Sequence, residues 1–252
     1  PRRRQCRCQC EAGGLVMADP VSIPASYQAE PVDPALLEGW LGWALPFFSA
    51  PVLQNPHVDL TLQLDVTAAF AQYQRNKASA ASGTPAVSFF AFLVWHLAQT
   101  LAQHPSFNLR CVDGEWVQLR NPPIFIPVAV GGAARFRDLV LENVYQQDYP
   151  TFLAHYRQQL ALASSPEGAP PSASSAFGHA HLMGNLPDLR FSGLTLHWRA
   201  DQTRGQSSFY FGQRYDQGER TLIPLAVRLH HSCTDPFVLN QLMADFNHRF
   251  TV

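Results

Sequence analysis

The sequence predicts an α/β protein of the α+β type, in which a mixed β-sheet forms one layer and helices covering it form the second. Strand-like and helix-like segments follow one another in mixed order along the 252 residues, which favours this arrangement. The chain is 46% hydrophobic and 15% charged, so it can bury the core of one large domain. Its formal net charge of −1 gives no basic surplus for nucleic acid, and no apolar run has the length of a membrane span. We therefore expect a soluble, cytoplasmic protein without nucleic-acid or membrane partners.

The N-terminal segment is basic, holds three of the five cysteines, and contains the first methionine, Met17. A metal site there would lack a second Cys/His cluster, and a signal peptide would lack its apolar stretch. We expect an N-terminal extension over residues 1–30, either disordered or upstream of a true start at Met17, and a single domain over residues 31–252. Cys111 and Cys233 are expected to be free thiols.

The first half of the chain carries both strand and helix signals. Residues 60–66 alternate like a strand, residues 67–77 and the strongly apolar residues 87–103 predict helices, and Asp113-Gly114 marks a hairpin. Four aromatic residues before these elements are expected to pack in the core or between subunits: Trp40, Trp43, Phe47 and Phe48. Later elements are a strand at 127–130, a mostly helical stretch at 139–163 interrupted near Pro150, a surface loop at 164–172, and strands at 189–198 and 207–211.

The chemistry of the chain is concentrated near its C-terminus. An apolar strand leaves Pro224 and ends in His230 and His231, and Asp235 follows just before a helical pattern at 237–246. A histidine at a strand end can accept a proton near neutral pH, which suits a general base acting on a hydroxyl or thiol. An isolated His-His pair is also typical of structural histidines. We expect His230 to face away from His231 and to bond to the backbone.

Several separated motifs resemble the chloramphenicol acetyltransferase family. Residues 212–224, followed by His-His-Ser-Cys-Thr-Asp, are similar to that family's G-K-Y-Y-x-Q-G…M-P and H-H-x-x-x-D-G motifs. Residues 63–67 resemble its Q-L-D-I-T strand, and residues 104–115 resemble its H-P-E-F-R…D-G-E segment. The resemblance runs from about residue 40 to residue 246 and implies the CoA-dependent acyltransferase fold of that family.

The resemblance also implies a mechanism and an assembly. His231 occupies the position of the base that removes a proton from the acceptor hydroxyl, which then attacks the thioester of acetyl-CoA. Asp235 occupies the position of an aspartate that braces the site through an ion pair with an N-terminal arginine. We expect acetyl-CoA or another acyl-CoA as cosubstrate, no permanently bound cofactor, a small-molecule acceptor, and a homotrimer with each site at a subunit interface.

The sequence departs from the family at four positions. Pro236 replaces a glycine, and the arginine partner of Asp235 is missing from the expected region near Trp43. Gly184 replaces the serine that stabilises the tetrahedral oxyanion, although the amide of Asn185 is nearby. Tyr210 replaces a threonine, which predicts a reshaped substrate region.

These departures leave three hypotheses for the function. The first is acyl transfer to a hydroxyl of an acceptor other than chloramphenicol. The second uses the same cleft and His231 for a cyclisation or another proton transfer, and the third is a non-catalytic trimeric binding protein. We expect no metal site, because His179 and His181, even with His230, lack a fourth ligand at a matching spacing.

Overall fold

The computed structural model describes residues 23–49, 55–79, 87–132, 135–165, 176–197 and 205–251. Most of the predicted N-terminal extension and most of the predicted loop at 164–172 therefore lie outside the described residues. The boundary predicted at residue 30 falls within β1 (Ala29–Pro31), which follows a short 3₁₀ helix, η1 (Ala25–Tyr27). The division of the chain into an extension and one domain stays a prediction.

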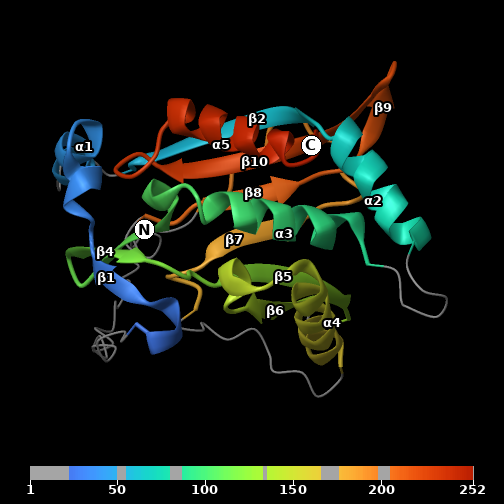
Figure 1. The fold of residues 1–252 in the computed structure, drawn as a ribbon, viewed down its shortest axis with the longest axis horizontal. Coiled ribbons are helices and arrows are strands. Elements are labelled where there is room, and N and C mark those ends of the chain that lie inside the picture. Colours follow the sequence, from blue (N-terminus) through green and yellow to red (C-terminus); the bar gives the residue numbers. More distant parts are fainter. Residues whose placement is uncertain are drawn as a thin grey trace, which may run out of the picture.

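A seven-stranded sheet forms the centre of the molecule, in the order β2-β10-β8-β7-β5-β6, with the short β9 paired to β10 (Figure 1). The β5–β7 and β7–β8 pairs are parallel and the other pairs are antiparallel, so the predicted mixed sheet is confirmed. Its strands are β2 (His57–Asp65), β5 (Ile124–Gly131), β6 (Arg135–Leu141), β7 (His181–Asn185), β8 (Ser208–Phe211), β9 (Tyr215–Gln217) and β10 (Arg220–His230).

A small second sheet contains β1, β4 and β3 in that order. The hairpin predicted at Asp113-Gly114 joins β3 (Leu109–Val112) to β4 (Glu115–Leu119). Both turn residues have positive φ, 51° for Asp113 and 88° for Gly114, as a tight hairpin of matching twist requires.

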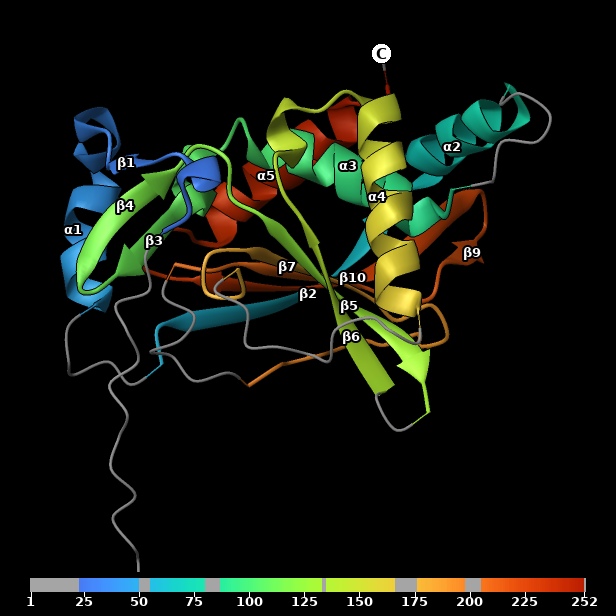
Figure 2. The same cartoon turned by 90° about the horizontal axis from the view of Figure 1, so that it is seen from below.

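Helices α2, α3, α4 and α5 lie on one face of the large sheet, and α1 stands beside the small sheet at the end of the molecule (Figure 2). The helices expected at residues 67–77 and 87–103 both form: α2 extends two residues beyond the first range, and α3 lies within the second. In α3 the hydroxyl of Ser88 caps the first turn by accepting from Ala91 N at 3.2 Å. The helices are α1 (Trp40–Phe48), α2 (Thr67–Ser79), α3 (Phe89–Leu101), α4 (Tyr149–Ser164) and α5 (Pro236–His248), with further 3₁₀ turns η2 (Pro34–Leu37), η3 (Pro105–Asn108) and η4 (Val144–Gln146).

Strand β10 lies between β2 and β8 and leads to the candidate base. Its alternate side chains Leu225, Val227 and Leu229 belong to the main core beneath the helices. The intervening side chains of Arg228 and His230 therefore point to the other, outer face of the sheet. That face carries the ion pair of Arg228 with Asp59 and the contact of His230 with the backbone of Ser232.

Two predicted elements are wrong in part. Residues 139–141 belong to β6 and not to a helix, because pairing with β5 overrides the local helical pattern; α4 begins only at Tyr149, with Pro150 in its first turn. No strand forms in the described part of 189–198. Leu194 N donates to Thr61 Oγ1 at 3.4 Å, so this segment is held against β2 by a side chain and not by a backbone ladder.

Candidate active site

The turn after β10 fixes the backbone of His231. Its N–H donates to the carbonyl of Pro56 at 2.7 Å, which ties the turn to the residue just before β2. The N–H of Thr234 donates back to the carbonyl of His230 at 3.1 Å and closes the turn. The strand end therefore presents His231 in a defined position.

The imidazole of His231 is half-buried and has one ring nitrogen engaged. Nδ1 lies 3.3 Å from the carbonyl oxygen of Thr234. A carbonyl only accepts, so this contact places the proton on Nδ1 and leaves the Nε2 lone pair available. Two rings flank the imidazole: Phe48 at 4.2 Å and Trp40 at 5.8 Å between centroids, both from α1.

Asp235 begins the helix that follows the turn of His231. Its Oδ1 accepts from the N–H of Val238 at 2.8 Å, which makes Asp235 the N-cap of α5. Pro236 then occupies the first helical position, where a missing N–H has no cost. Among the described residues, no ion-pair partner of Asp235 is present, and the helix cap is the contact that the structure shows for its carboxylate.

The neighbours of His231 have structural contacts. His230 Nδ1 accepts from the N–H of Ser232 at 3.3 Å, which confirms the predicted backbone role of His230. The hydroxyl of Ser232 lies 3.4 Å from that of Ser49 and is not a partner of His231. Cys233 is a free thiol, as predicted, and burial raises its pKa strongly, so it stays protonated.

Gly184 and Tyr210 form a closely fitted pair on the outer face of the sheet. They are direct partners in the parallel β7–β8 register. A Cβ at Gly184 would lie 2.1 Å and 2.2 Å from two carbons of the Tyr210 ring. The ring therefore occupies the space that any side chain at position 184 would need. Burial also raises the pKa of the Tyr210 hydroxyl, which remains a neutral donor.

Asn185, the last residue of β7, lines a cavity of about 330 Å³ on the helix side of the sheet. Arg214 is the one cationic side chain among the described residues of its lining, and its guanidinium lies 3.9 Å from the centre of the Phe70 ring. The cavity opens between the start of α3 and the chain segments that follow β7 and β8. Other lining residues are Ser88, Phe89, Phe90, Leu93, Pro187, Phe211, Gly212, Gln213 and Ile223.

The structure does not bring all the predicted site residues together within one chain. Tyr210 pairs with Ala226, four residues before the end of β10 at His230, and His231 lies in the turn beyond that end. At about 3.4 Å per residue, Ala226 and the strand end are about 14 Å apart. His231 and Asp235 thus form one group, and Gly184, Asn185 and Tyr210 form another.

His181, one of the histidines considered for a metal site, is surrounded by polar groups of the protein. His181 is fully buried, and its Nε2 lies 3.0 Å from Asn108 Oδ1 and 3.1 Å from the hydroxyl of Tyr145. Burial holds the pKa of His181 well below its usual value. Within the described ranges, no group of three or more His, Cys, Asp or Glu side chains is arranged to hold a metal ion.

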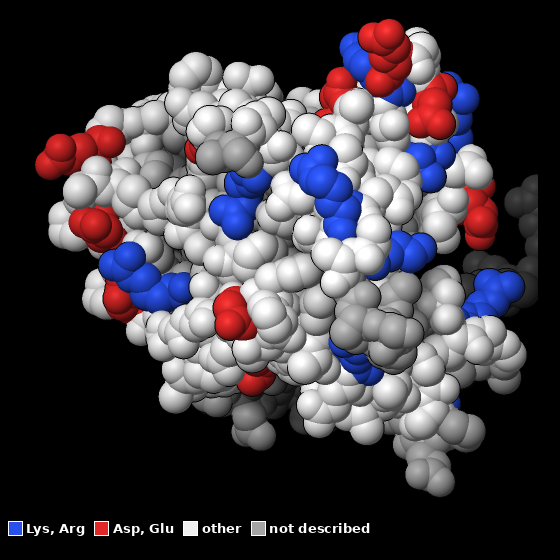
Figure 3. All heavy atoms as spheres, turned by 45° about the vertical axis from the view of Figure 1, so that its right-hand side comes forward, with Lys and Arg blue, Asp and Glu red and all other residues white. Residues whose placement is uncertain are grey.

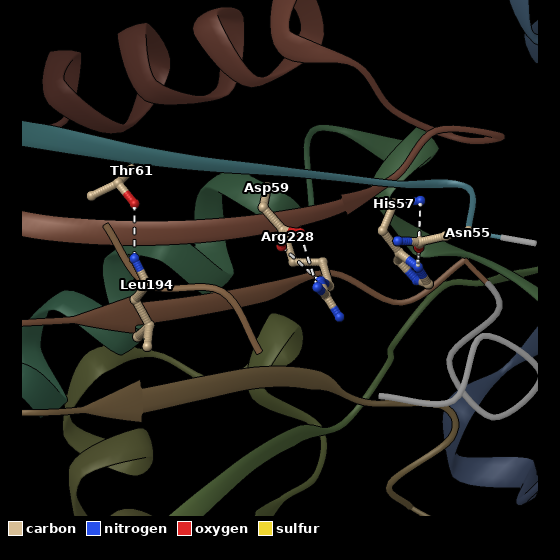
Figure 4. Close-up of polar contacts among 6 residues, drawn as sticks. All are labelled: Asn55, His57, Asp59, Thr61, Leu194 and Arg228. Atoms are coloured by element: carbon tan, nitrogen blue, oxygen red, sulfur yellow. Dashed lines mark hydrogen bonds and ion pairs between the residues drawn. The ribbon is translucent and has the colours of Figure 1, made fainter. Parts of the chain in front are cut away.

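Sequence reasoning missed an ion pair near the site. Arg228 and Asp59 form a bidentate ion pair on the outer face of β10 and β2 (Figure 4). Nε donates to Oδ1 at 2.7 Å and Nη2 donates to Oδ2 at 2.9 Å. Alternation along β10 places Arg228 outward, but nothing in the sequence reveals which residue of β2 lies opposite. The contacts of Trp40 and Phe48 with His231 were missed for the same reason.

On the face shown in Figure 3, basic and acidic side chains are interspersed over the surface. They do not form one continuous basic area on that face. Among the helices of the described part of the chain, none combines the length and apolar character needed to cross a membrane.

A family model described as chloramphenicol acetyltransferase matches residues 52–247. The chain belongs to this family. The chloramphenicol acetyltransferase of a Klebsiella species is 27% identical over 188 residues, which cover 73% of this chain and 78% of that protein. The one from Streptomyces acrimycini is 28% identical over 183 residues, covering 71% and 76%. The protein is an acyltransferase, and the predicted family is confirmed.

Solved structures show the same fold. A chloramphenicol acetyltransferase superposes with a TM-score of 0.70 at 22% identity, covering 87% of this chain and 98% of the other. The cubic core of the pyruvate dehydrogenase multienzyme complex superposes with a TM-score of 0.63 at 17% identity, covering 83% and 86%. The predicted CoA-dependent acyltransferase fold is therefore confirmed.

Proposed function

We propose that this acyltransferase uses His231 as the general base that moves an acyl group from CoA to the hydroxyl of a small molecule. The observation that carries the proposal is the ring of His231, whose Nδ1 faces a carbonyl while Nε2 has no hydrogen bond to a described residue. Nε2 takes the acceptor proton as the hydroxyl oxygen attacks the thioester carbonyl. The proton then passes to the departing CoA thiolate.

The second group of residues offers two candidate donors to the reacting thioester, one on each face of the sheet. Gly184 has no hydroxyl to donate to the tetrahedral oxyanion, so the candidates are the Tyr210 hydroxyl on the outer face and the Asn185 amide on the helix side. We assign the cavity lined by Asn185 and Arg214 to the acyl-CoA arm, because Arg214 offers a fork of donors to phosphate. Acetyl-CoA is the first donor to test.

The acceptor is proposed to differ from chloramphenicol. Tyr210 places an aromatic ring where the family has a threonine, so the region around the thioester is narrower. Trp40 and Phe48 flank the base with apolar rings. A compact, uncharged aromatic alcohol fits these surroundings.

A homotrimer with shared sites explains why the site residues are divided. About 14 Å of strand separate the partner of Tyr210, Ala226, from the turn that holds His231, so we propose that a second copy brings a base to the Tyr210 group. On α1, Trp43 and Phe47 stack at 4.7 Å and are 53% and 49% exposed, which suits a subunit contact beside the base.

The direct test follows free thiol release from acetyl-CoA with a panel of amphenicols and aromatic alcohols. Acceptor-dependent release is expected, and His231→Ala should reduce kcat by about 100- to 10,000-fold. His248→Gln changes an exposed histidine at the end of α5 and serves as the matched control. Release that survives His231→Ala would contradict the role of His231 as base.

The shared site has its own test. Co-expression of His231→Ala chains with Tyr210→Phe chains pairs an intact base from one copy with an intact Tyr210 hydroxyl from another. Each variant alone should be inactive, and mixed assemblies should recover activity. Mixed assemblies as inactive as the parents would contradict a site built from two subunits.

A further inference from the structure

The outer face of the sheet holds a buried ion pair two residues before the end of β10. Asp59 and Arg228 are direct cross-strand partners, joined by Nε to Oδ1 at 2.7 Å and Nη2 to Oδ2 at 2.9 Å (Figure 4). The Arg228 side chain is 6% exposed and that of Asp59 is 23% exposed. A guanidinium buried to this extent is costly to leave unpaired, so the pair selects one register of β2 on β10.

The same two strands hold the backbone of His231. Two residues from the ion pair along each strand, His57 and His230 are cross-strand partners, and the centroids of their rings lie 5.2 Å apart. His57 Nδ1 also lies 2.8 Å from Asn55 Oδ1. At the next position the N–H of His231 donates to the Pro56 carbonyl at 2.7 Å. Any slip or fraying of this end of β2 would therefore remove the carbonyl that holds His231.

This end of β2 has a backbone ladder on one side only, and Val58 packs it against the main core. Within the described sheet, β2 is an edge strand whose only ladder partner is β10. Edge strands open more readily than central strands because one side of their backbone has no partner. The guanidinium of Arg228 adds two charge-assisted hydrogen bonds to Asp59, two residues from the end of the β2–β10 ladder.

We infer that Asp59 and Arg228 are positioning residues for His231: their ion pair locks the end of β2 on β10 and so keeps the Pro56 carbonyl beneath the His231 amide. This inference rests on the proposed role of His231 as base. It also gives the turn of the base a buried ion pair, whereas Asp235 has no ion-pair partner among the described residues. Arg228 does not itself take part in proton transfer.

The experiment compares Asp59→Asn, Arg228→Gln and the swapped pair Asp59→Arg with Arg228→Asp. The first readout is hydrogen–deuterium exchange at the His231 amide, relative to the amide of Leu97 in the core of α3, and it needs no substrate. The second readout is kcat and KM for the best acceptor. Arg120→Gln is the matched control, because Arg120 and Glu30 form an ion pair at the surface, 52% and 38% exposed.

Each single variant should speed exchange at His231 by about tenfold or more while Leu97 changes less. Each should also lower kcat by about 100-fold with KM unchanged, since a small misplacement of the base is enough for such a loss. The swapped pair should restore both readouts, and Arg120→Gln should change neither.

Three results would overturn the inference. The first is an unchanged exchange rate at the His231 amide, and the second is an exchange rate that rises equally at the Leu97 amide. The third is a change in KM alone that the swapped pair does not restore, because this would indicate that the two residues contact the substrate directly. If exchange responds as expected and the swap restores it, but no acceptor supports transfer, the positioning inference stands and the proposed function fails.

Discussion

Replacing Gly184 by serine should destabilise the protein, although the same residue type is common in the family at this position. The new Cβ would lie 2.1 Å from a carbon of the Tyr210 ring, whereas carbon atoms in contact prefer about 3.5–4.0 Å. The ring must therefore move by more than about 1 Å. Because β8 is hydrogen-bonded on both sides, by β7 and β10, the backbone of Tyr210 cannot move away with it.

Overpacking of this kind costs about 1–3 kcal/mol. In a chain of this size each kcal/mol lowers Tm by about 2–4 °C, so Gly184→Ser should melt about 2–12 °C below the parent protein. Differential scanning calorimetry measures the shift. Gly193→Ser is the control, because no atom lies within 4 Å of a Cβ at that exposed glycine.

The second substitution decides the cause. Tyr210→Thr removes the ring, so Gly184→Ser should lower the free energy of unfolding much less in that background. The coupling free energy between the two substitutions should be favourable by about 1 kcal/mol or more. Additive effects of the two substitutions, or a Gly184→Ser variant that melts like the parent, would refute the fitted-pair reasoning.

Three further predictions follow from single contacts. Tyr210→Phe keeps the ring but removes the proposed oxyanion donor, so kcat should fall by about 100- to 1000-fold without a change in Tm. If kcat is unchanged, the Asn185 amide is the remaining candidate donor. Asp235→Ala removes the cap of α5 and should lower the free energy of unfolding by about 1 kcal/mol, measured by urea titration, whereas Asp235→Asn should retain most of it. Burial and Arg249 lower the pKa of His96 to about 3, so the unfolded chain binds a proton below pH 6.5 that the folded chain does not. Stability should therefore be complete above pH 6.5 and fall as the pH drops toward 3, by up to about 1.4 kcal/mol per pH unit, and calorimetry of His96→Leu should show a flatter profile.

Local sequence signals predicted the elements whose conformation is set by their own residues. Asp113-Gly114 specifies a hairpin because both positions need positive φ, and the apolar pattern at 87–103 specifies a buried helix. The helical prediction failed at residues 139–141, where the pairing of β6 with β5, and not local preference, decides the conformation.

The sequence by itself determined the family, the alternation of faces along β10 and the candidate base, because spacing and motif order do not depend on distant contacts. Only the tertiary structure decided that Arg228 faces Asp59, that Tyr210 covers Gly184, and that Phe48 flanks His231. The physical reason is register. Periodicity tells which face a side chain occupies, but its neighbour across the strand is set by long-range pairing, and a shift of one residue would exchange every one of these contacts.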